Sequence, residues 1–257
     1  MSIKAVLFDL DGTLLQMDQD EFVKTYFMYL AKHLAPKGYE SEKLLKVFWA
    51  GVNAMVTNDG SCTNEEAFWK VFVDAYGENS IEDKPYIDEF YKNGFNQVEA
   101  VCGRYKEAKE IISFVKEKRK IAILATNPLF PCVATQNRIR WAGLDAETFA
   151  EYTTYENCHY CKPNPEYYVE LLERHNLKPE ECIMVGNDVE EDMFPIEKLG
   201  MKGFLLTNCL INKNEEDISK FPRGDFEALK MYPSLNVRAL RQHCHNKTPY
   251  CHLLFQH

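Results

Sequence analysis

The feature that most constrains the fold of this chain is a regular alternation of apolar runs and amphipathic stretches after Gly103. Strand-like runs at 121–125, 182–185 and 203–206 are separated by stretches with helical periodicity, and a short strand is expected near 149–150. The apolar run at 3–8 indicates a further buried strand. Repeated strand–helix units of this length are typical of a parallel sheet with helices on both faces. The sequence therefore predicts an α/β fold with a doubly wound parallel sheet.

Residues from about 19 to 99 have helical periods only, with about four apolar faces separated by turn-forming residues. We interpret the aromatic stripes of this insert as its core and not as a surface for stacking a cofactor. The expected domains are an α/β core formed by residues 1–15 and 103–243, a smaller all-helical domain at 16–102, and a C-terminal tail at 244–257. The role of the tail, which is rich in Cys and His, is not indicated.

The charge of the chain argues against some partners. Its 30 basic and 39 acidic residues give a net charge of −9, so binding to nucleic acid would gain nothing from counterion release. No apolar run reaches the length of a membrane span, and no secretion signal is recognisable at the N-terminus. We therefore expect no nucleic-acid or membrane partner and a cytoplasmic location, whereas the oligomeric state is not indicated.

Nine cysteines are scattered along the chain, and several lie within apolar patterns. Reduced, buried cysteine behaves as a small hydrophobic residue, which is the interpretation we favour for most of them. Cys158 and Cys161 have the spacing of half a zinc site, for which His243-Cys244-His245 could supply the other half. A single pair of this kind is weak support for zinc.

Two carboxylates follow the first apolar run directly, in the segment Asp9-Leu10-Asp11-Gly12-Thr13. Residues two apart on a strand project to the same side, and like charges held close together repel unless a cation neutralises them. Gly12 permits a sharp turn that brings the backbone close to a ligand. A plain polar turn at the end of a strand is the alternative. The segment thus favours a divalent metal at the end of the first strand.

Polar residues also stand after the other strands. Thr126-Asn127 ends the second apolar run, Asp188 follows the run at 182–185 with Asp192 four residues later, and Lys162 lies between them. Each has a simpler explanation, as a turn, a surface lysine or acids at a helix start. Ligands of an open parallel sheet bind outside the carboxyl ends of its strands. Four such endings in order therefore favour one anion-binding site.

Together, these segments resemble the four ordered motifs of the haloacid dehalogenase (HAD) superfamily. They are Asp9-Leu10-Asp11-Gly12-Thr13, Thr126-Asn127, Lys162-Pro163, and Gly186-Asn187-Asp188 with Asp192. Residues 1–15 and about 103–210 resemble its Rossmannoid core, and the insert resembles the helical cap domain placed after the first motif. Two departures are visible: Asn187 stands where the family often has Asp, and Pro128 lacks a backbone donor beside the phosphate-binding turn.

The resemblance implies catalytic roles for three residues. Asp9 would be the nucleophile and a metal ligand. Asp11 would protonate the leaving alcohol, then activate water, and offer its backbone carbonyl to the metal. Lys162 would neutralise the phosphoryl charge and restrain Asp9.

It also implies binding roles. Thr126 and Asn127 would bind phosphoryl oxygens, the latter through its backbone amide. Asp188 would complete a Mg²⁺ shell, with Asp192 acting directly or through water and Glu191 able to replace either. Magnesium suits such an oxygen-only, partly hydrated site better than zinc does.

The function implied is a magnesium-dependent phosphatase that hydrolyses a small phosphorylated metabolite through an aspartyl-phosphate intermediate. One alternative is a phosphotransferase or phosphosugar mutase of the same chemistry, in which a sugar hydroxyl accepts the phosphoryl group. Another is a non-catalytic binding protein that keeps the fold, although every expected catalytic residue is present. A dehalogenase is disfavoured because Asp11 would have no role in it. The sequence does not indicate the substrate.

Overall fold

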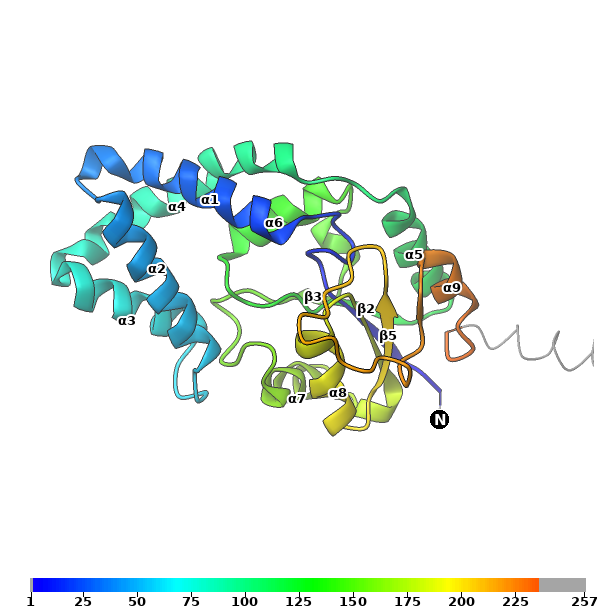
Figure 1. Cartoon of the computed structure of the whole chain (residues 1–257). Coiled ribbons are helices and arrows are strands. Elements are labelled where there is room, and N and C mark those ends of the chain that lie inside the picture. The colour runs from blue at the N-terminus through cyan, green and yellow to red at the C-terminus, as the bar shows by residue number, and fades with distance from the viewer. Residues whose placement is uncertain (1, 236–257) are drawn as a thin grey trace, which may run out of the picture.

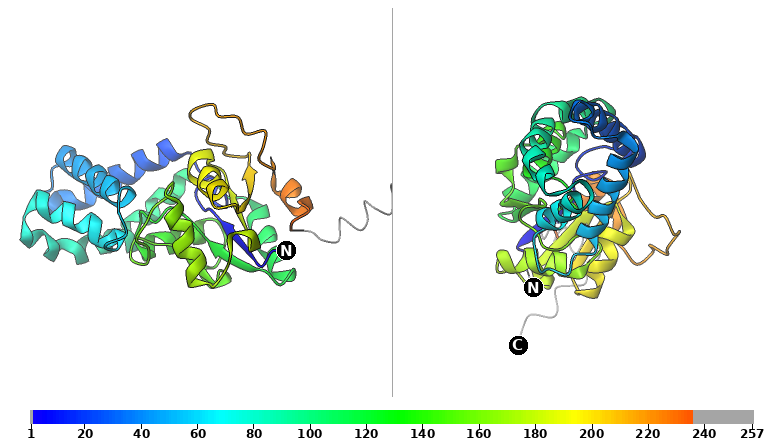
Figure 2. Two further views of the ribbon diagram at one scale, coloured as in Figure 1. Left: turned by 90° about the horizontal axis from the view of Figure 1, so that it is seen from below. Right: turned by 90° about the vertical axis from the view of Figure 1, so that its left-hand side faces the viewer.

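The computed structural model describes residues 2–235. The predicted tail at 244–257 and the last residues of the predicted core, 236–243, lie outside the described residues. The molecule is elongated, with the helical insert at one end and the sheet at the other (Figures 1 and 2). The N-terminus lies at the end of the sheet that is remote from the insert (Figure 2).

Six parallel strands form one sheet in the order β3-β2-β1-β4-β5-β6, which confirms the α/β prediction. Their bounds are Ala5–Phe8 for β1, Ile121–Leu124 for β2, Glu151–Tyr152 for β3, Cys182–Gly186 for β4, Lys202–Leu206 for β5 and Arg223–Gly224 for β6. The strand expected near 149–150 begins one residue later, at Glu151. The sequence did not predict β6, because two residues are too short to show a strand period.

Strand β1 lies between β2 and β4 and pairs with both, so that Ala5 is opposite Ile121 on one side and Cys182 on the other. The chain runs from β1 outward to β2 and β3, then returns to β4 on the opposite side of β1. This reversal creates a switch point, and ligands bind to such sheets in the crevice outside the carboxyl ends of the two strands there. The segments after β1 and β4 are therefore the expected walls of the site.

Helices cover both faces of the sheet. The first face carries α5 (Lys106–Glu117), α6 (Cys132–Trp141) and α9 (Phe226–Met231), and the second carries α7 (Pro165–Arg174) and α8 (Phe194–Lys198). Alternate residues of β1 serve the two cores: Val6 and Phe8 pack on the first face, Ala5 and Leu7 on the second. The sheet is therefore doubly wound, as the sequence predicts.

The insert consists of four α-helices, with short 3₁₀ segments between α1 and α2 and between α3 and α4 and a turn between α2 and α3. They are α1 (Gln19–Leu34), α2 (Ser41–Val56), α3 (Asn64–Tyr76) and α4 (Lys84–Lys92), followed by a 3₁₀ segment at Gly94–Val101. Two helices begin with side-chain caps: Asp18 accepts from the Glu21 N–H, and Thr63 forms a reciprocal capping box with Glu66. The number of helices agrees with the periodicity of the sequence.

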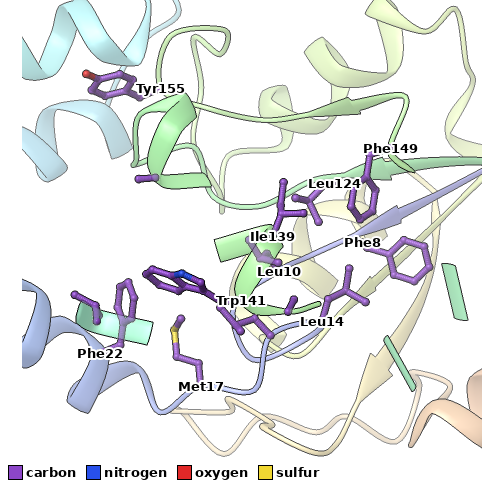
Figure 3. Packing of buried hydrophobic residues seen from close by; sticks show 14 of the residues in the cluster. Phe8, Leu10, Leu14, Met17, Phe22, Leu124, Ile139, Trp141, Phe149 and Tyr155 are labelled. Carbon is purple, nitrogen blue, oxygen red and sulfur yellow. The ribbon is translucent and has the colours of Figure 1, made fainter. Parts of the chain in front are cut away.

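The insert shares its apolar core with the first face of the sheet. Phe95, which follows α4, lies with its ring centroid 4.9 Å from that of Trp141 on α6 and 6.2 Å from that of Phe22 on α1. Figure 3 shows this cluster extending from Phe8 and Leu124 of the sheet, past Trp141, to Phe22. The insert thus packs against α6 and against the segment at Phe130 that leads into α6. Within residues 2–235, no helix is long and apolar enough to cross a membrane.

Candidate active site

Asp9 is the first residue after β1 and remains attached to the sheet, because its N–H donates to the carbonyl of Val185 at 2.9 Å. One carboxylate oxygen, Oδ1, lies 2.9 Å from Nζ of Lys162. Burial raises the pKa of Asp9 to about 7, although the ammonium group of Lys162 acts in the opposite direction. Asp9 is therefore a buried carboxylate whose charge depends on neighbouring cations.

Lys162 lies in the segment before α7, and its side chain is fully buried between two carboxylates. Its Nζ is 2.9 Å from Asp9 Oδ1 and 2.7 Å from Asp192 Oδ1. Burial alone would lower the pKa of Lys162, but the charges of Asp192 and Asp9 hold it well above its ordinary value. The lysine is thus a fixed positive charge at the carboxyl ends of the strands and not a solvated surface residue.

Asp192 holds this lysine in place. Its second oxygen, Oδ2, accepts hydrogen bonds of 3.0 Å from the N–H groups of Asn187 and Asp188. Gly186 makes room for it, since a Cβ there would lie 2.1 Å from that oxygen. Both oxygens of Asp192 are therefore already engaged with protein groups, which favours a role in positioning Lys162.

Asp11 has a different environment from Asp9. The strand ends at Phe8, so the alternation expected of a strand no longer applies at Asp11, and Gly12 turns the chain with a φ of +83°. Oδ2 of Asp11 forms an ion pair with the guanidinium group of Arg138, a residue of α6 that is buried. Oδ1 of Asp11 is buried and has no hydrogen-bond partner among the described residues. One oxygen of Asp11 is thus left for a ligand.

Arg138 is the main site residue that the sequence analysis missed. Its guanidinium carbon lies 4.5 Å from the centre of the Phe130 ring, and Nη2 donates to Thr135 at 3.3 Å. The sequence feature that could have revealed Arg138 is its helical spacing from Ala134 and Trp141, which puts the three residues on the same face of α6. An arginine on the buried face of a helix requires a charged or polar partner.

Thr126 and Asn127 follow β2, and their surroundings differ from one another. The carbonyl of Thr126 accepts from the Thr153 hydroxyl at 2.6 Å and from the Tyr167 hydroxyl at 2.9 Å, which fixes the turn. The side chain of Asn127 links two other segments: Oδ1 accepts from the N–H of Lys162 at 3.2 Å, and Nδ2 donates to Glu191 at 3.0 Å. Asn127 therefore ties the β2 end to the Lys162 segment.

The departure from the expected motif at Asn187 has a physical explanation. Its Oδ1 accepts from the Thr13 hydroxyl at 2.8 Å, while its Nδ2 donates to the carbonyl of Cys209 at 2.6 Å. An ionised aspartate could accept the first hydrogen bond but could not donate the second. Asn187 thus connects the segment after β1 with the segment after β5.

Asp188 caps a π-helical turn at Val189–Met193. Its Oδ1 accepts from the N–H groups of Glu190 and Glu191 at 2.8 and 3.0 Å. Burial raises the pKa of Asp188 and raises that of Glu191 to about 8. Single π turns occur frequently at functional sites.

The charges of this region are compatible with a bound cation. Five acids (Asp9, Asp11, Asp188, Glu191 and Asp192) gather around two bases, Lys162 and Arg138. Nowhere in residues 2–235 do three His, Cys, Asp or Glu side chains form a ready-made metal cluster. The expected Mg²⁺ donors are two carboxylates, a backbone carbonyl and water, a set that does not require such a cluster. The excess of negative charge and the oxygen-only chemistry fit magnesium.

The comparison with protein families agrees with this geometry. A family model described as haloacid dehalogenase-like hydrolase matches residues 3–200. The chain belongs to this family. It is therefore an enzyme of the hydrolase class.

Three relatives of this HAD-like hydrolase have identities of 25% or less. The pyrophosphatase PpaX of Bacillus cereus (strain B4264) is 25% identical over 189 residues, which cover 73% of this chain and 76% of that protein. A 2-haloacid dehalogenase structure from Pseudomonas syringae pv. Tomato DC3000 has 18% identity and a TM-score of 0.59, covering 92% of this chain and 99% of the other. The HAD-hydrolase YfnB of Bacillus subtilis, whose structure is bound to magnesium, has 17% identity and a TM-score of 0.53, with coverages of 92% and 100%. At these identities the two structures support the fold.

The cysteine pair of this HAD-like hydrolase is buried and reduced. Cys158 and Cys161 form no disulfide with a described residue, and burial raises the pKa of the Cys158 thiol to about 12. Asn64, at the start of α3, donates to the sulfur of Cys161 at 3.3 Å, and its N–H donates to the Cys158 carbonyl at 2.9 Å. The pair thus belongs to the contact between the insert and the Lys162 segment. His243, Cys244 and His245 lie outside the described residues.

Proposed function

We propose that this hydrolase is a magnesium-dependent phosphatase that acts on small phosphorylated molecules through an aspartyl-phosphate intermediate. The observation that carries the proposal is the pairing of Asp9 with a fully buried Lys162 while Asp11, two residues later, keeps a free oxygen. A nucleophile, a fixed positive charge and a proton carrier are the groups that phosphoryl transfer to a carboxylate requires. The relationship to pyrophosphatase PpaX supports chemistry at phosphorus.

The reaction proceeds in two displacements. In the first, a carboxylate oxygen of Asp9 forms a bond to phosphorus while the bond between phosphorus and the leaving oxygen breaks, and Asp11 gives its proton to that oxygen. In the second, Asp11 takes a proton from water as the water oxygen forms a bond to phosphorus, and the bond between phosphorus and the Asp9 oxygen breaks. This step releases phosphate and restores the carboxylate of Asp9. The positive charge of Lys162 offsets the negative charge of the phosphoryl oxygens. The hydroxyl of Thr126 and the backbone N–H of Asn127 orient these oxygens.

The residues that would hold the metal are Asp9, Asp188 and the backbone carbonyl of Asp11. When bound, Mg²⁺ would offset charge on the phosphoryl group and on Asp9. Asp192 would reach the ion through water, since its oxygens are engaged with Lys162 and with two backbone N–H groups. The magnesium bound to the structurally similar YfnB supports the choice of ion.

We further propose that the insert, residues 16–102, acts as a cap over this site and that residues 1–15 and 103–243 form the catalytic core. The N–H groups of Asn64 and Glu65 donate to the carbonyls of Cys158 and Tyr155, so that the start of α3 is attached to the segment leading to Lys162. A cap in contact with this segment leaves room for a small molecule and not for a folded protein. A phosphosugar mutase of the same chemistry remains the second candidate.

Release of phosphate from 4-nitrophenyl phosphate tests the proposal. We expect turnover with Mg²⁺, a loss of at least about 100-fold after EDTA treatment, and recovery when Mg²⁺ is restored, because the carboxylates otherwise repel the anionic ester. Free phosphate is measured together with 4-nitrophenolate. Full activity in EDTA would contradict the assignment of the metal, and the absence of any phosphate release would contradict the proposed function.

The role of Asp11 is tested by replacing it with asparagine. In Asp11→Asn we expect turnover of an alkyl phosphate to fall by about 10²- to 10⁴-fold, the usual contribution of a general acid–base. The first step with 4-nitrophenyl phosphate should suffer less, because 4-nitrophenolate leaves without a proton. Rapid-quench measurements should then show a burst of 4-nitrophenolate. An equal loss for both esters in the first step would argue against Asp11 as the general acid.

A further inference from the structure

The insert encloses an apolar cavity of about 110 Å³. Its walls come from α1 to α4 and from two segments outside the insert, at Leu129-Phe130 and Tyr155. Tyr155, at the upper left of Figure 3, lies against the helices of the insert. Among the described residues that line the cavity, none carries a charge. The cavity is therefore an apolar pocket that the insert and the remainder of the chain build together.

The polar groups around this cavity offer few hydrogen bonds to a ligand. The hydroxyls of Tyr26 and Tyr91 lie 2.7 Å apart and bond to one another. The indole N–H of Trp69 is buried and makes no hydrogen bond of ordinary geometry within residues 2–235, although its nearest polar neighbour is the hydroxyl of Tyr155, which also lines the cavity. A ligand with several hydroxyl groups would leave most of them unpaired here, and an unpaired buried hydroxyl weakens binding strongly. The cavity thus suits a group of carbon and hydrogen.

Two contacts link the walls of the cavity to the segments of the site. Leu129 follows the Thr126-Asn127 turn, and its N–H donates to the Asn127 carbonyl at 2.8 Å. The ring of Phe130, also a wall of the cavity, lies under the guanidinium group of Arg138, which forms the ion pair with Asp11. Because Asp11 is the proposed proton donor to the leaving oxygen, the leaving group must approach Asp11. One residue, Arg138, thus separates the proton donor from the cavity wall.

From this arrangement we infer that the substrate is a phosphate monoester of a small apolar alcohol, whose hydrocarbon part occupies the cavity. The inference rests on the proposed function and specifies its substrate class. An engineered cavity of roughly 150 Å³ in another protein takes up benzene, so the present one suits a group of about four to six carbons. A sugar phosphate would place its hydroxyls against aromatic rings. Pyrophosphate would place an anion there without a compensating charge.

A second hollow, more open and of about 610 Å³, borders Asn187 and the two connections to the insert. Its lining includes Asp18 and Asp20, whose negative charges repel an anionic ester, and a single lysine, Lys213. This hollow is a poorer place for the leaving group of a phosphate ester. The apolar cavity remains the better match.

Two esters of equal size test the inference with the full chain and Mg²⁺. 3-Methylbutyl phosphate and glycerol 3-phosphate are both esters of primary alcohols and have equal numbers of non-hydrogen atoms, so their intrinsic reactivities are similar. We expect kcat/KM for 3-methylbutyl phosphate to exceed that for glycerol 3-phosphate by about tenfold or more, because only the second buries hydroxyls. Glucose 6-phosphate and pyrophosphate should also be poorer substrates.

Two substitutions in α2 test whether the cavity causes the preference between the two esters. Trp49 lines the cavity and is 49% exposed, whereas Leu45, one turn earlier, is 40% exposed and lies outside the cavity lining. Trp49→Ala should lower the preference for 3-methylbutyl phosphate over glycerol 3-phosphate about fivefold to tenfold, and Leu45→Ala should leave it within twofold. Melting curves check that both variants are folded.

The outcomes separate this inference from the proposed function. If phosphate is released but glycerol 3-phosphate, glucose 6-phosphate or pyrophosphate is preferred, the inference is wrong and the phosphatase assignment stands. If Trp49→Ala and Leu45→Ala have equal effects, the cavity does not select the substrate and the inference is likewise overturned. If no ester is hydrolysed, the proposed function itself fails.

Discussion

Asp9→Asn is expected to reduce phosphatase turnover by about 10³- to 10⁶-fold, because the amide cannot form the covalent bond to phosphorus on which both steps depend. Asparagine has the shape of aspartate, and its oxygen can still accept from Lys162 at the position of the 2.9 Å hydrogen bond. The fold should therefore persist. The measurement is the rate of phosphate release at saturating 4-nitrophenyl phosphate with Mg²⁺.

The control for this variant is Asp74→Asn, an exposed acid on α3 that lines neither of the two cavities. It removes the same charge at a position outside the site and should keep activity within twofold. Acid quenching during turnover with a ³²P-labelled ester should leave label on the wild-type protein and none on Asp9→Asn. Undiminished turnover by Asp9→Asn, or equal labelling of both proteins, would exclude Asp9 as the nucleophile.

Lys162→Met is expected to lower both stability and activity. The lysine side chain is fully buried between Asp9 and Asp192, and removing one partner of a buried ionic group leaves uncompensated charge, at a cost of about 3–5 kcal/mol in the free energy of unfolding. Turnover should also fall by at least about 100-fold, because an unscreened phosphoryl charge opposes attack by a carboxylate. Urea unfolding in EDTA measures the first effect without a contribution from bound metal.

Lys198→Met is the matched control, since Lys198 is an exposed residue at the end of α8, and its unfolding free energy should change by less than about 0.5 kcal/mol. The double variant Lys162→Met/Asp192→Asn should be more stable than the sum of the single effects predicts, by about 0.5–3 kcal/mol. A stability loss below about 1 kcal/mol for Lys162→Met, or strict additivity in the double variant, would show that the ion pairs are not what stabilises this region.

Much of the architecture could be predicted from local pattern. The apolar runs at 3–8, 121–125 and 182–185 became β1, β2 and β4. These elements show a clear period over several residues. By contrast, β6 is too short to show one, and the π turn at Val189–Met193 has the same apolar and acidic residues that an ordinary helix start would have.

The sequence predicted some residues of the site but not all of their contacts. Asp9, Lys162 and Asp192 meet in one network, and Asp188 begins the adjacent turn, so the strand-end argument selected residues that the fold brings together. Position at a strand end gives no sign that Asp192 anchors Lys162, or that the Asn127 side chain binds the Lys162 segment. Arg138 could not be found from strand ends, because this residue lies within a helix.

The sequence by itself determined the order of strands and helices and the residue types that follow each strand, because both depend on neighbours a few positions away. Tertiary structure alone decided which groups meet. Asp11 and Arg138 are 127 positions apart, and Lys162 is 153 positions from Asp9, so their contacts depend on strand order and on how α6 packs against the sheet. The apolar cavity likewise exists only where the insert closes on Phe130 and Tyr155. The residue types after each strand thus indicate the chemistry. Packing between distant segments decides which groups contact Asp11 and where the apolar cavity lies.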